Sequence, residues 1–156
     1  MAKLEKATFG AGCFWGVQST FDDTKGVVKT EVGYEGGAMK NPLYKDVCTD
    51  ATGHAEVVEI TFDHAKISYR ELLDIFWNTH DPHQVDRQGP DVGSQYRSVI
   101  FFHSPRQESQ ARESLTSEEK KRQRTIATHI VPATTFYPAE GYHQKYLQKK
   151  GLKMCH

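Results

Sequence analysis

The most constraining feature of this sequence is the stretch from Gly10 to Gly16, which reads Gly-Ala-Gly-Cys-Phe-Trp-Gly. The apolar run 7–9 before it predicts a strand, and Gly10 and Gly12 predict a tight turn. Apolar residues then recur at helical spacing, which predicts a helix that begins at or near Cys13. These apolar residues are Phe14, Val17 and Phe21.

Cys13 has the sequence environment of a nucleophile. At the first turn of a helix, unpaired backbone N–H groups and the positive end of the helix dipole favour a thiolate over a thiol. The glycines let other groups approach the sulfur closely, and Phe14 and Trp15 supply an aromatic wall. A small buried cysteine without chemistry is the alternative interpretation. A dinucleotide-binding loop is excluded because Trp15 stands where that motif needs its third glycine.

Composition excludes several classes of function. The chain has 156 residues, and its 20 basic side chains balance 20 acidic ones, so neither nucleic acid nor an anionic membrane is an expected partner. No apolar run approaches the length of a membrane span, and the N-terminus lacks the apolar stretch of a signal peptide. Three cysteines, an odd number, do not suggest a secreted disulfide framework. We expect a monomeric, cytoplasmic protein with a single domain over residues 1–156.

The remaining pattern predicts an α+β fold. Alternating residues predict further strands, and helical spacing behind the caps Ser68 and Ser104 predicts further helices. The predicted strands cover residues 27–34, 55–62, 96–102 and 126–131, and the predicted helices begin near residues 68 and 104 and cover residues 140–149. The first six elements follow the order β-α-β-β-α-β, which is typical of a two-layer sandwich with a ferredoxin-like core and an antiparallel sheet.

Two long loops, 35–54 and 80–95, interrupt this pattern. Loops of this length inside a compact domain are usually functional, and both can reach the same edge as the glycine turn. At the other end of the chain, we expect the Lys-rich tail 148–156 to be mobile.

Glu56 is a candidate acid. The period of its strand puts the side chain on the same side as Val58 and Ile60, so an inward-facing strand would hold a carboxyl group against apolar surface. Desolvation would then raise the pKa of Glu56 and make it a proton donor near neutral pH. The alternative is a glutamate at a strand end that points into water.

Three other functions are open at this point. Eight histidines and three cysteines invite a metal site, but no Cys-x-x-Cys or His-x-x-x-His pair occurs, so no metal is expected. Cys13 with His54 or His143 would supply the nucleophile and base of a hydrolase or acyltransferase. A cage of aromatic side chains for a methylated cation would leave Cys13 without a role. The cage residues would be Phe14, Trp15, Tyr44 and Tyr96.

Four blocks of the sequence together resemble the A-type peptide methionine sulfoxide reductases. They occur in the order of that family and span nearly the whole chain. The blocks are residues 12–16 (Gly-Cys-Phe-Trp-Gly), 41–56 (Asn-Pro-Leu-Tyr to Thr-Gly-His-Ala-Glu), 81–98 (Asp-Pro to Gln-Tyr-Arg-Ser) and 139–147 (Ala-Glu-Gly-Tyr-His-Gln-Lys-Tyr-Leu). The chain departs from the family at Leu43, where threonine is frequent.

This resemblance implies that the protein reduces the S epimer of methionine sulfoxide, free or in proteins, and so repairs oxidised proteins. It makes Cys13 the nucleophile and Glu56 a hydrogen-bonding partner of the sulfoxide oxygen. The substrate-binding residues that it implies are Phe14, Trp15, Tyr44, Asp91 and Tyr96. Of these, the first two receive the methyl group on sulfur, the tyrosines act with Glu56, and Asp91 helps to hold the substrate.

The resemblance also implies a second thiol. Attack by Cys13 leaves methionine and a sulfenic acid, which condenses with another cysteine to a disulfide. Cys155, in the tail, is the expected resolving residue, and Cys48 is expected to be a buried loop residue. No bound cofactor is implied. Thioredoxin, or dithiothreitol in vitro, is the expected reductant of the disulfide.

Overall fold

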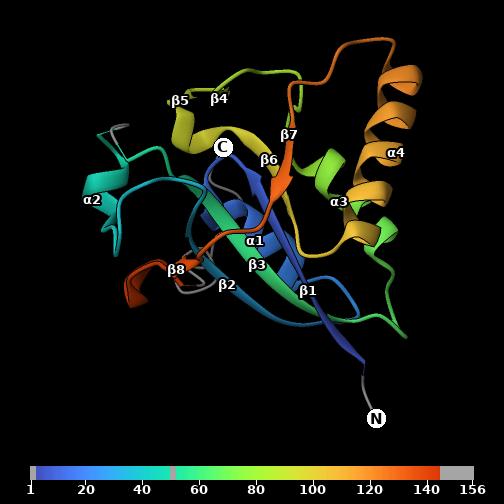
Figure 1. Cartoon of the computed structure of the whole chain (residues 1–156), viewed down its shortest axis with the longest axis horizontal. Helices are drawn as coiled ribbons and strands as arrows, with labels where there is room; N and C mark the ends of the chain where they lie inside the picture. The colour runs from blue at the N-terminus through green and yellow to red at the C-terminus, as the bar shows by residue number, and fades with distance from the viewer. Residues whose placement is uncertain (1–2, 50–51, 145–156) are drawn as a thin grey trace.

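The structure is a computed structural model that describes residues 3–49 and 52–144 (Figure 1). Its elements, in chain order, are β1 (Leu4–Ala11), α1 (Phe14–Asp22), β2 (Val27–Glu35), α2 (Tyr44–Val47), β3 (Ala55–Asp63), α3 (Tyr69–Thr79), β4 (Arg87–Gln88), β5 (Asp91–Val92), the 3-10 helix η1 (Ser94–Tyr96), β6 (Ser98–Phe102), α4 (Pro105–Arg122), β7 (His129–Pro132), β8 (Tyr137–Pro138) and the 3-10 helix η2 (Gly141–His143).

The main sheet has the strand order β7-β6-β1-β3-β2-β8 within the described part of the chain. β1 pairs with β3 and β6, and β2 pairs with β3 and β8, in each case antiparallel. β6 and β7 are parallel, so the sheet is mixed. The sequence pattern predicts a purely antiparallel sheet, and this part of the prediction is wrong. The predicted α+β class is confirmed.

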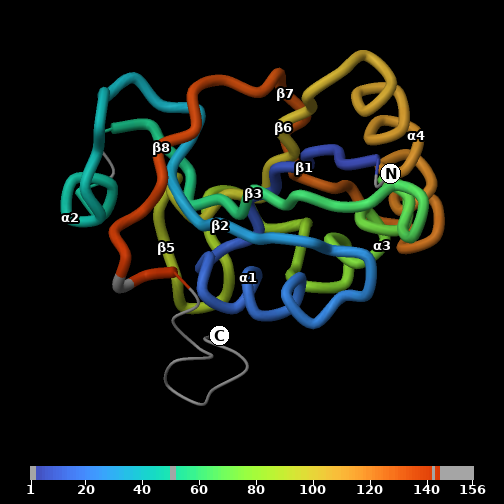
Figure 2. Tube along the Cα trace, turned by 90° about the horizontal axis from the view of Figure 1, so that it is seen from below, coloured from blue at the N-terminus to red at the C-terminus, as the bar shows by residue number. Residues whose placement is uncertain are grey.

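Helices α1 and α3 lie below the strands in Figure 2, and α4, at the right of this view, packs on α3, β6 and β7. Side chains of all three helices enter the main apolar core. The main apolar core lies between the two layers, and Phe9 of β1 is at its centre. The Phe9 ring centroid is 5.7 Å from that of Phe21 in α1 and 4.9 Å from that of Phe76 in α3. Aromatic pairs at these distances add about 0.5–1.5 kcal/mol each beyond burial alone. One β-strand residue therefore holds two helices against the sheet.

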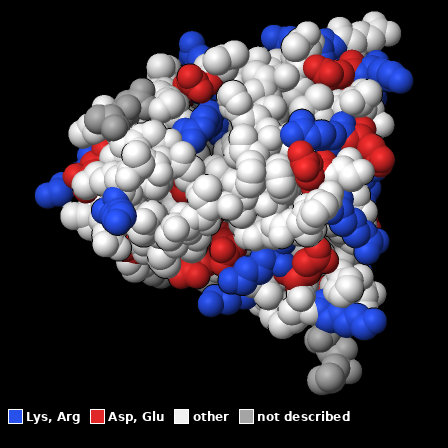
Figure 3. Space-filling view, in the orientation of Figure 1, with Lys and Arg blue, Asp and Glu red and all other residues white. Residues whose placement is uncertain are grey.

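The opposite face is covered by the chain between β7 and β8, which crosses in front of the strands in Figure 1. Val131 and Phe136 pack there on a smaller apolar cluster that includes Phe101. Glu35 is also buried on this side, where its Oε2 accepts a hydrogen bond from the backbone N–H of Thr134 at 3.0 Å. Burial raises the pKa of Glu35 to about 7. The middle of this face carries mainly uncharged residues, with Lys, Arg, Asp and Glu toward its edges (Figure 3).

Most predicted elements form where the sequence pattern indicates. The first strand and helix, the strand from residue 55, and the caps Ser68 and Ser104 are confirmed, with Ser68 accepting from the Glu71 N–H and Ser104 from the Gln107 N–H. The expected strand at 126–131 forms as β7, shifted to His129–Pro132.

One predicted boundary is wrong, and another is only partly described. Tyr96 does not begin a strand but ends η1, because Gly93 at φ 142° turns the chain and its carbonyl accepts from the Tyr96 N–H at 3.0 Å. The helix predicted over 140–149 is described only to residue 144, where the chain forms the 3-10 turn η2, and residues 145–149 lie outside the described residues. The side-chain amide of Gln144 pairs with both backbone groups of Val32 at 2.9 Å, and so holds the chain against β2. The predicted mobile tail lies outside the described residues.

The loops that carry candidate residues are tied to one edge of the sheet. His54 accepts a hydrogen bond from the Gly37 N–H at 3.0 Å through Nδ1, and its Nε2 contacts the Met39 carbonyl oxygen at 2.6 Å. Arg97 donates to the carbonyls of Ser94 at 2.8 Å and Gly53 at 3.0 Å. The two long loops are therefore held together at the ends of β3 and β6.

Gly37→Ala tests how closely these loops pack. An added Cβ would lie 2.6 Å from Cγ of His54 and against the backbone of Thr52. We expect the free energy of unfolding to fall by about 1–3 kcal/mol, because overpacking forces the backbone apart. Urea denaturation measures the change. The matched control is Gly141→Ala, where nothing lies within 4 Å of the new Cβ and the change should stay below about 0.5 kcal/mol. Equal losses in the two variants would contradict this packing.

Candidate active site

Cys13 lies between the glycine turn and the first residue of α1, as the sequence predicts. Gly12 adopts φ 93°, a conformation that other residues rarely take. A Cβ on Gly10 would lie 2.7 Å from Cγ1 of Val99, so β6 approaches this turn closely. Cys13 is 9% exposed. The thiol is thus placed at the positive end of the helix dipole.

Glu56 reaches this helix start from β3. It shares the helix-facing side of the strand with Val58 and Ile60, and it is 1% exposed, which confirms the predicted strand phase. Its Oε1 accepts from the backbone N–H of Phe14 at 3.4 Å, and its Oε2 accepts from Nε2 of Gln95 at 3.1 Å. The carboxyl group therefore lies next to the first peptide after Cys13.

Tyr44 from α2 and Tyr96 from η1 complete the polar part of the site. Burial, together with the charge of Glu56, raises the pKa of Tyr44 well above its usual value. The same two causes raise the pKa of Tyr96 to about 12, although a hydrogen bond with Tyr44 opposes the rise and Asp91 on β5 adds to it. Both phenols therefore stay protonated hydrogen-bond donors at neutral pH.

The predicted aromatic wall is present and larger than the sequence analysis indicates. The Phe14 ring lies 6.4 Å from Trp15 and 6.2 Å from Tyr44, measured between centroids. The ring of His143 is 4.4 Å from Tyr44 and 5.6 Å from Trp15. Phe14 also packs on Tyr34 of β2 at 5.8 Å. These rings form an apolar surface beside Cys13 with the tyrosine hydroxyls close to Glu56.

His143 and Glu140 are site residues that the sequence reasoning missed as a pair. Nε1 of Trp15 donates to Nδ1 of His143 at 3.0 Å, which requires the neutral imidazole to carry its proton on Nε2. Glu140 accepts from the Tyr34 hydroxyl and from the Tyr44 N–H, both at 3.1 Å. Burial alone would raise the pKa of Glu140, but these hydrogen bonds and the charge of His143 lower it below its usual value. Their signal in the sequence is the block 139–147, in which only His143 has a predicted role, as the base of the alternative hydrolase or acyltransferase.

Cys48 differs from its prediction. It is exposed at the end of α2 and not buried in a loop. Its Sγ accepts from Nε2 of Gln95 at 3.6 Å, and the Tyr44 hydroxyl is a further hydrogen-bonding neighbour. Cys48 is therefore close to the candidate site. Cys155 lies outside the described residues.

The alternative functions find less support in the geometry. His54 uses both ring nitrogens on loop backbone, so it does not have the partner of a catalytic base. Within residues 3–49 and 52–144, no group of three or more His, Cys, Asp or Glu side chains is arranged to hold a metal ion. Every helix of the described chain is too short or too polar to cross a membrane.

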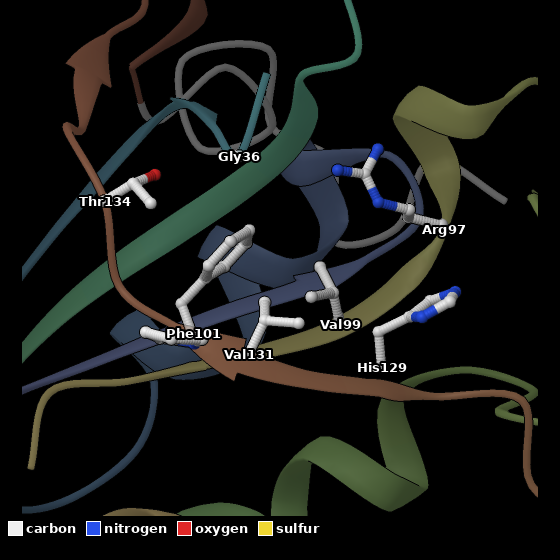
Figure 4. Close-up of a pocket in the computed structure, with 8 residues that line it drawn as sticks. Gly36, Arg97, Val99, Phe101, His129, Val131 and Thr134 are labelled. Atoms are coloured by element: carbon white, nitrogen blue, oxygen red, sulfur yellow. The ribbon is translucent and has the colours of Figure 1, made fainter. Parts of the chain in front are cut away.

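An apolar cavity lies in another part of the molecule. It has a volume of about 290 Å³ and is on the face opposite α1 (Figure 4). Val99, Phe101 and Val131 form its apolar surface, and Arg97 and Thr134 lie toward its rim. None of the predicted site residues lines it.

Protonation of His143 should loosen Trp15. Burial lowers the pKa of His143 below its usual value of 6.5, although the charge of Glu140 opposes this. The neutral ring therefore stabilises the fold above pH 6.5, and this contribution is lost as the pH falls through the lowered pKa. In a Trp77→Phe background, which leaves Trp15 as the single tryptophan of the chain, Trp15 fluorescence should change with a midpoint below pH 6.5.

His143→Phe in the same background is the control for this titration. It keeps a ring at the position but removes the acceptor of the Trp15 N–H, so the fluorescence transition should disappear. A transition that persists in this variant, or one centred above pH 6.5, would contradict the assignment to His143.

Comparison with known proteins identifies the family. The sequence model described as "Peptide methionine sulfoxide reductase" matches residues 5–156. A relative from Methanothermobacter thermautotrophicus, "Peptide methionine sulfoxide reductase MsrA", is 58% identical over 158 residues, which cover 100% of this chain and 94% of the relative. A second protein of that name, from Acidobacterium capsulatum, is 56% identical over 98% of this chain and 99% of its own.

Solved structures agree. Reduced Mxr1 from Saccharomyces cerevisiae has a TM-score of 0.92 and 36% identity, covering 96% of this chain and 87% of its own. The structure of Mxr1 in complex with Trx2 has a TM-score of 0.66 and 27% identity, covering 92% of this chain and 85% of its own. Together with the site around Cys13, these likenesses show that the chain is an oxidoreductase that belongs to the peptide methionine sulfoxide reductase family.

Proposed function

We propose that this protein reduces the S epimer of methionine sulfoxide, free or within proteins, to methionine through a sulfenic acid on Cys13. The observation that carries the proposal is the contact of the Glu56 carboxyl with the first peptide of α1, directly after Cys13. Cys13, as the nucleophile, and Glu56, as the proton donor, would then contact the sulfoxide group of the substrate from two sides. Membership of the family argues against the hydrolase and cation-cage alternatives.

The polar residues account for activation of the substrate. A sulfoxide sulfur is a poor electrophile until its oxygen is protonated or strongly hydrogen-bonded. In our proposal the oxygen sits among Glu56, Tyr44 and Tyr96, and burial of the Glu56 side chain favours its neutral, proton-donating form. The two phenols donate hydrogen bonds without adding negative charge to the site. We also propose that Asp91, whose charge raises the pKa of Tyr96, helps to hold the substrate.

The first step then balances as one oxygen transfer. The Cys13 thiolate attacks the sulfoxide sulfur as Glu56 delivers a proton to the sulfoxide oxygen, and the new sulfur–sulfur bond then breaks as the protonated oxygen passes to the Cys13 sulfur. The products are methionine, which has gained two electrons, and Cys13 sulfenic acid, which holds the oxygen. The aromatic surface of Phe14 and Trp15 takes the methyl group, and the fixed places of methyl and oxygen leave room for one epimer.

A second thiol is needed to return Cys13 to its reduced form. Condensation of the sulfenic acid with a thiol releases water and forms a disulfide, which a dithiol then reduces by exchange. We propose Cys155 as this thiol and thioredoxin as the reductant, with no bound cofactor. Mxr1, the relative that was solved in complex with Trx2, supports a thioredoxin partner.

We also propose that the scaffold is ferredoxin-like. The antiparallel order β6-β1-β3-β2 supports this classification, as do α1, which connects β1 to β2, and α3, which follows β3.

Glu56→Gln tests the proton donor. The amide still donates a hydrogen bond but cannot deliver a proton, so we expect binding to persist while the single-turnover rate of Cys13 oxidation falls about a hundred- to ten-thousand-fold. Rapid-quench thiol counting after mixing with methionine sulfoxide gives this rate, and Cys13→Ser provides its zero. A fall of less than about threefold would remove Glu56 from proton transfer.

Cys155→Ser tests the resolving thiol. We expect about one turnover, then accumulation of a Cys13 sulfenic acid that dimedone traps, and loss of thioredoxin-supported cycling. Cys48→Ser is the matched control and should cycle as the unaltered protein does. Undiminished cycling of Cys155→Ser, or a Cys13–Cys48 disulfide in peptide maps of the oxidised protein, would exclude Cys155 from the reaction.

A further inference from the structure

Gln95 has a role in the site that neither the sequence pattern nor the family comparison assigns. We propose that Gln95 is the positioning residue that orients the Glu56 carboxyl group and tunes its affinity for the proton. This inference rests on the proposed function of Glu56 as a proton donor, but it concerns a different residue and a separate measurement.

The first argument is that Gln95 is held in place on both sides. It is the middle residue of η1 and is 3% exposed. The carbonyl of Gly93 accepts from the Tyr96 N–H at 3.0 Å and closes the turn around it. Arg97 then ties the Ser94 carbonyl, at 2.8 Å, to that of Gly53, at 3.0 Å, in the turn that leads into β3. The strand that carries Glu56 and the helix that carries Gln95 are thus joined next to the site.

The second argument is the pairing of the amide. Nε2 of Gln95 donates to Oε2 of Glu56 at 3.1 Å and to Sγ of Cys48 at 3.6 Å. An amide NH₂ group has two hydrogens, so these two acceptors match its donor capacity. A buried polar group that loses its hydrogen-bond partner destabilises the fold, so the native structure favours this pairing over other positions of the amide. One side chain therefore connects β3, α2 and η1.

The third argument concerns which oxygen of Glu56 acts. Gln95 contacts Oε2, whereas Oε1 is the oxygen beside the Phe14 N–H and hence beside Cys13. A donor fixed on Oε2 prevents rotation of the carboxyl group and keeps Oε1 toward the nucleophile. Fixing the reacting group in this way lowers the barrier of the chemical step. A donor on Oε2 also stabilises the carboxylate that remains after the proton has left.

Other titratable groups surround the same carboxyl group and must stay constant in a test. These groups are Tyr44 of α2, Cys48 directly after α2, Tyr96 of η1, and Cys13, which precedes the Phe14 amide. Replacing Gln95 by an uncharged side chain changes none of these charges directly. A change in the pH dependence of the first step then reports on Glu56.

Gln95→Met is the test, because it keeps the length of the side chain and removes the donor. The single-turnover rate of Cys13 oxidation by methionine sulfoxide is measured across pH. If protonated Glu56 is required, the rate falls above the pKa of Glu56, and this alkaline limb should be absent in Glu56→Gln. Loss of a hydrogen bond to the carboxylate raises the pKa, so in Gln95→Met the limb should move to higher pH by about one unit. We expect the rate on the plateau to fall about tenfold.

Gln88→Met is the matched control. Gln88 is also a buried glutamine of the same loop, but its amide pairs with the backbone of Asp81. Its loss should lower the urea midpoint without moving the alkaline limb. An unmoved limb in Gln95→Met, or an equal movement in Gln88→Met, would overturn the proposal.

Gln95→Glu keeps the test decisive if Gln95→Met does not fold. It has the shape of glutamine, and a second carboxyl group beside Glu56 should also move the limb to higher pH. An unmoved limb in this variant would again overturn the proposal. If the unaltered protein does not oxidise Cys13 with methionine sulfoxide, the proposed function fails instead. If it does so with an alkaline limb that Gln95 variants leave in place, only the role of Gln95 fails.

Discussion

The site depends on one contact between a strand and a helix, in which the Glu56 carboxyl group of β3 accepts a hydrogen bond from the N–H of Phe14 at the start of α1. This contact requires the right strand phase in β3 and a sharp turn at the end of β1. It also requires the absence of a side chain at Gly10, where a Cβ would lie 3.3 Å from the Glu56 carbonyl oxygen. Gly10 and Gly12 therefore allow the Glu56 carboxyl group to contact the start of α1. The same geometry puts this carboxyl group next to the residue that carries the thiol, Cys13.

Burying a carboxyl group in this place forces the surrounding loops to be ordered. A buried polar group without partners destabilises the fold, so each carboxyl oxygen of Glu56 needs a hydrogen-bond donor from outside its own strand. Gln95 supplies one from η1, and the Phe14 amide supplies the other. The loops are in turn fixed by His54 and Arg97, which hydrogen-bond backbone groups near the end of β3. The long loops of this chain are therefore parts of one hydrogen-bonded assembly at the edge of the sheet.

The sequence predicted the parts of this arrangement that depend on local periodicity. The phase of β3 put Glu56 on the same side as Val58 and Ile60, and the spacing after Cys13 located α1, because both follow from the geometry of one element. Features that depend on contacts between distant residues were missed. Nothing near Glu140 or His143 indicates that they pair with Tyr44 and Trp15 about a hundred residues earlier.

The predictions that are wrong also concern features that depend on contacts between distant residues. The exposure of Cys48 follows from the position of the short helix α2, and the parallel partner β7 follows from the path of the chain after α4. Neither has a local pattern of its own. Tyr96 was placed in a strand because apolar residues follow it, whereas the backbone conformation of Gly93 decides the turn. Family resemblance located the tyrosines of the site in the sequence, but only the fold gives them a common position.

The raised pKa values of Tyr44 and Tyr96 separate their proposed role from that of Glu56. Burial and the charge of Glu56 raise the pKa of both phenols, to about 12 for Tyr96, so neither gives up its proton near neutral pH. In the proposed reaction they therefore hold the sulfoxide oxygen by hydrogen bonds, and the proton comes from the carboxyl group of Glu56. A phenol that ionised easily would place a second negative charge next to the attacking thiolate and raise the barrier. In the proposed reaction, the aromatic surroundings that would take the methyl group also keep the phenols neutral, so recognition and activation of the substrate would follow from the same burial.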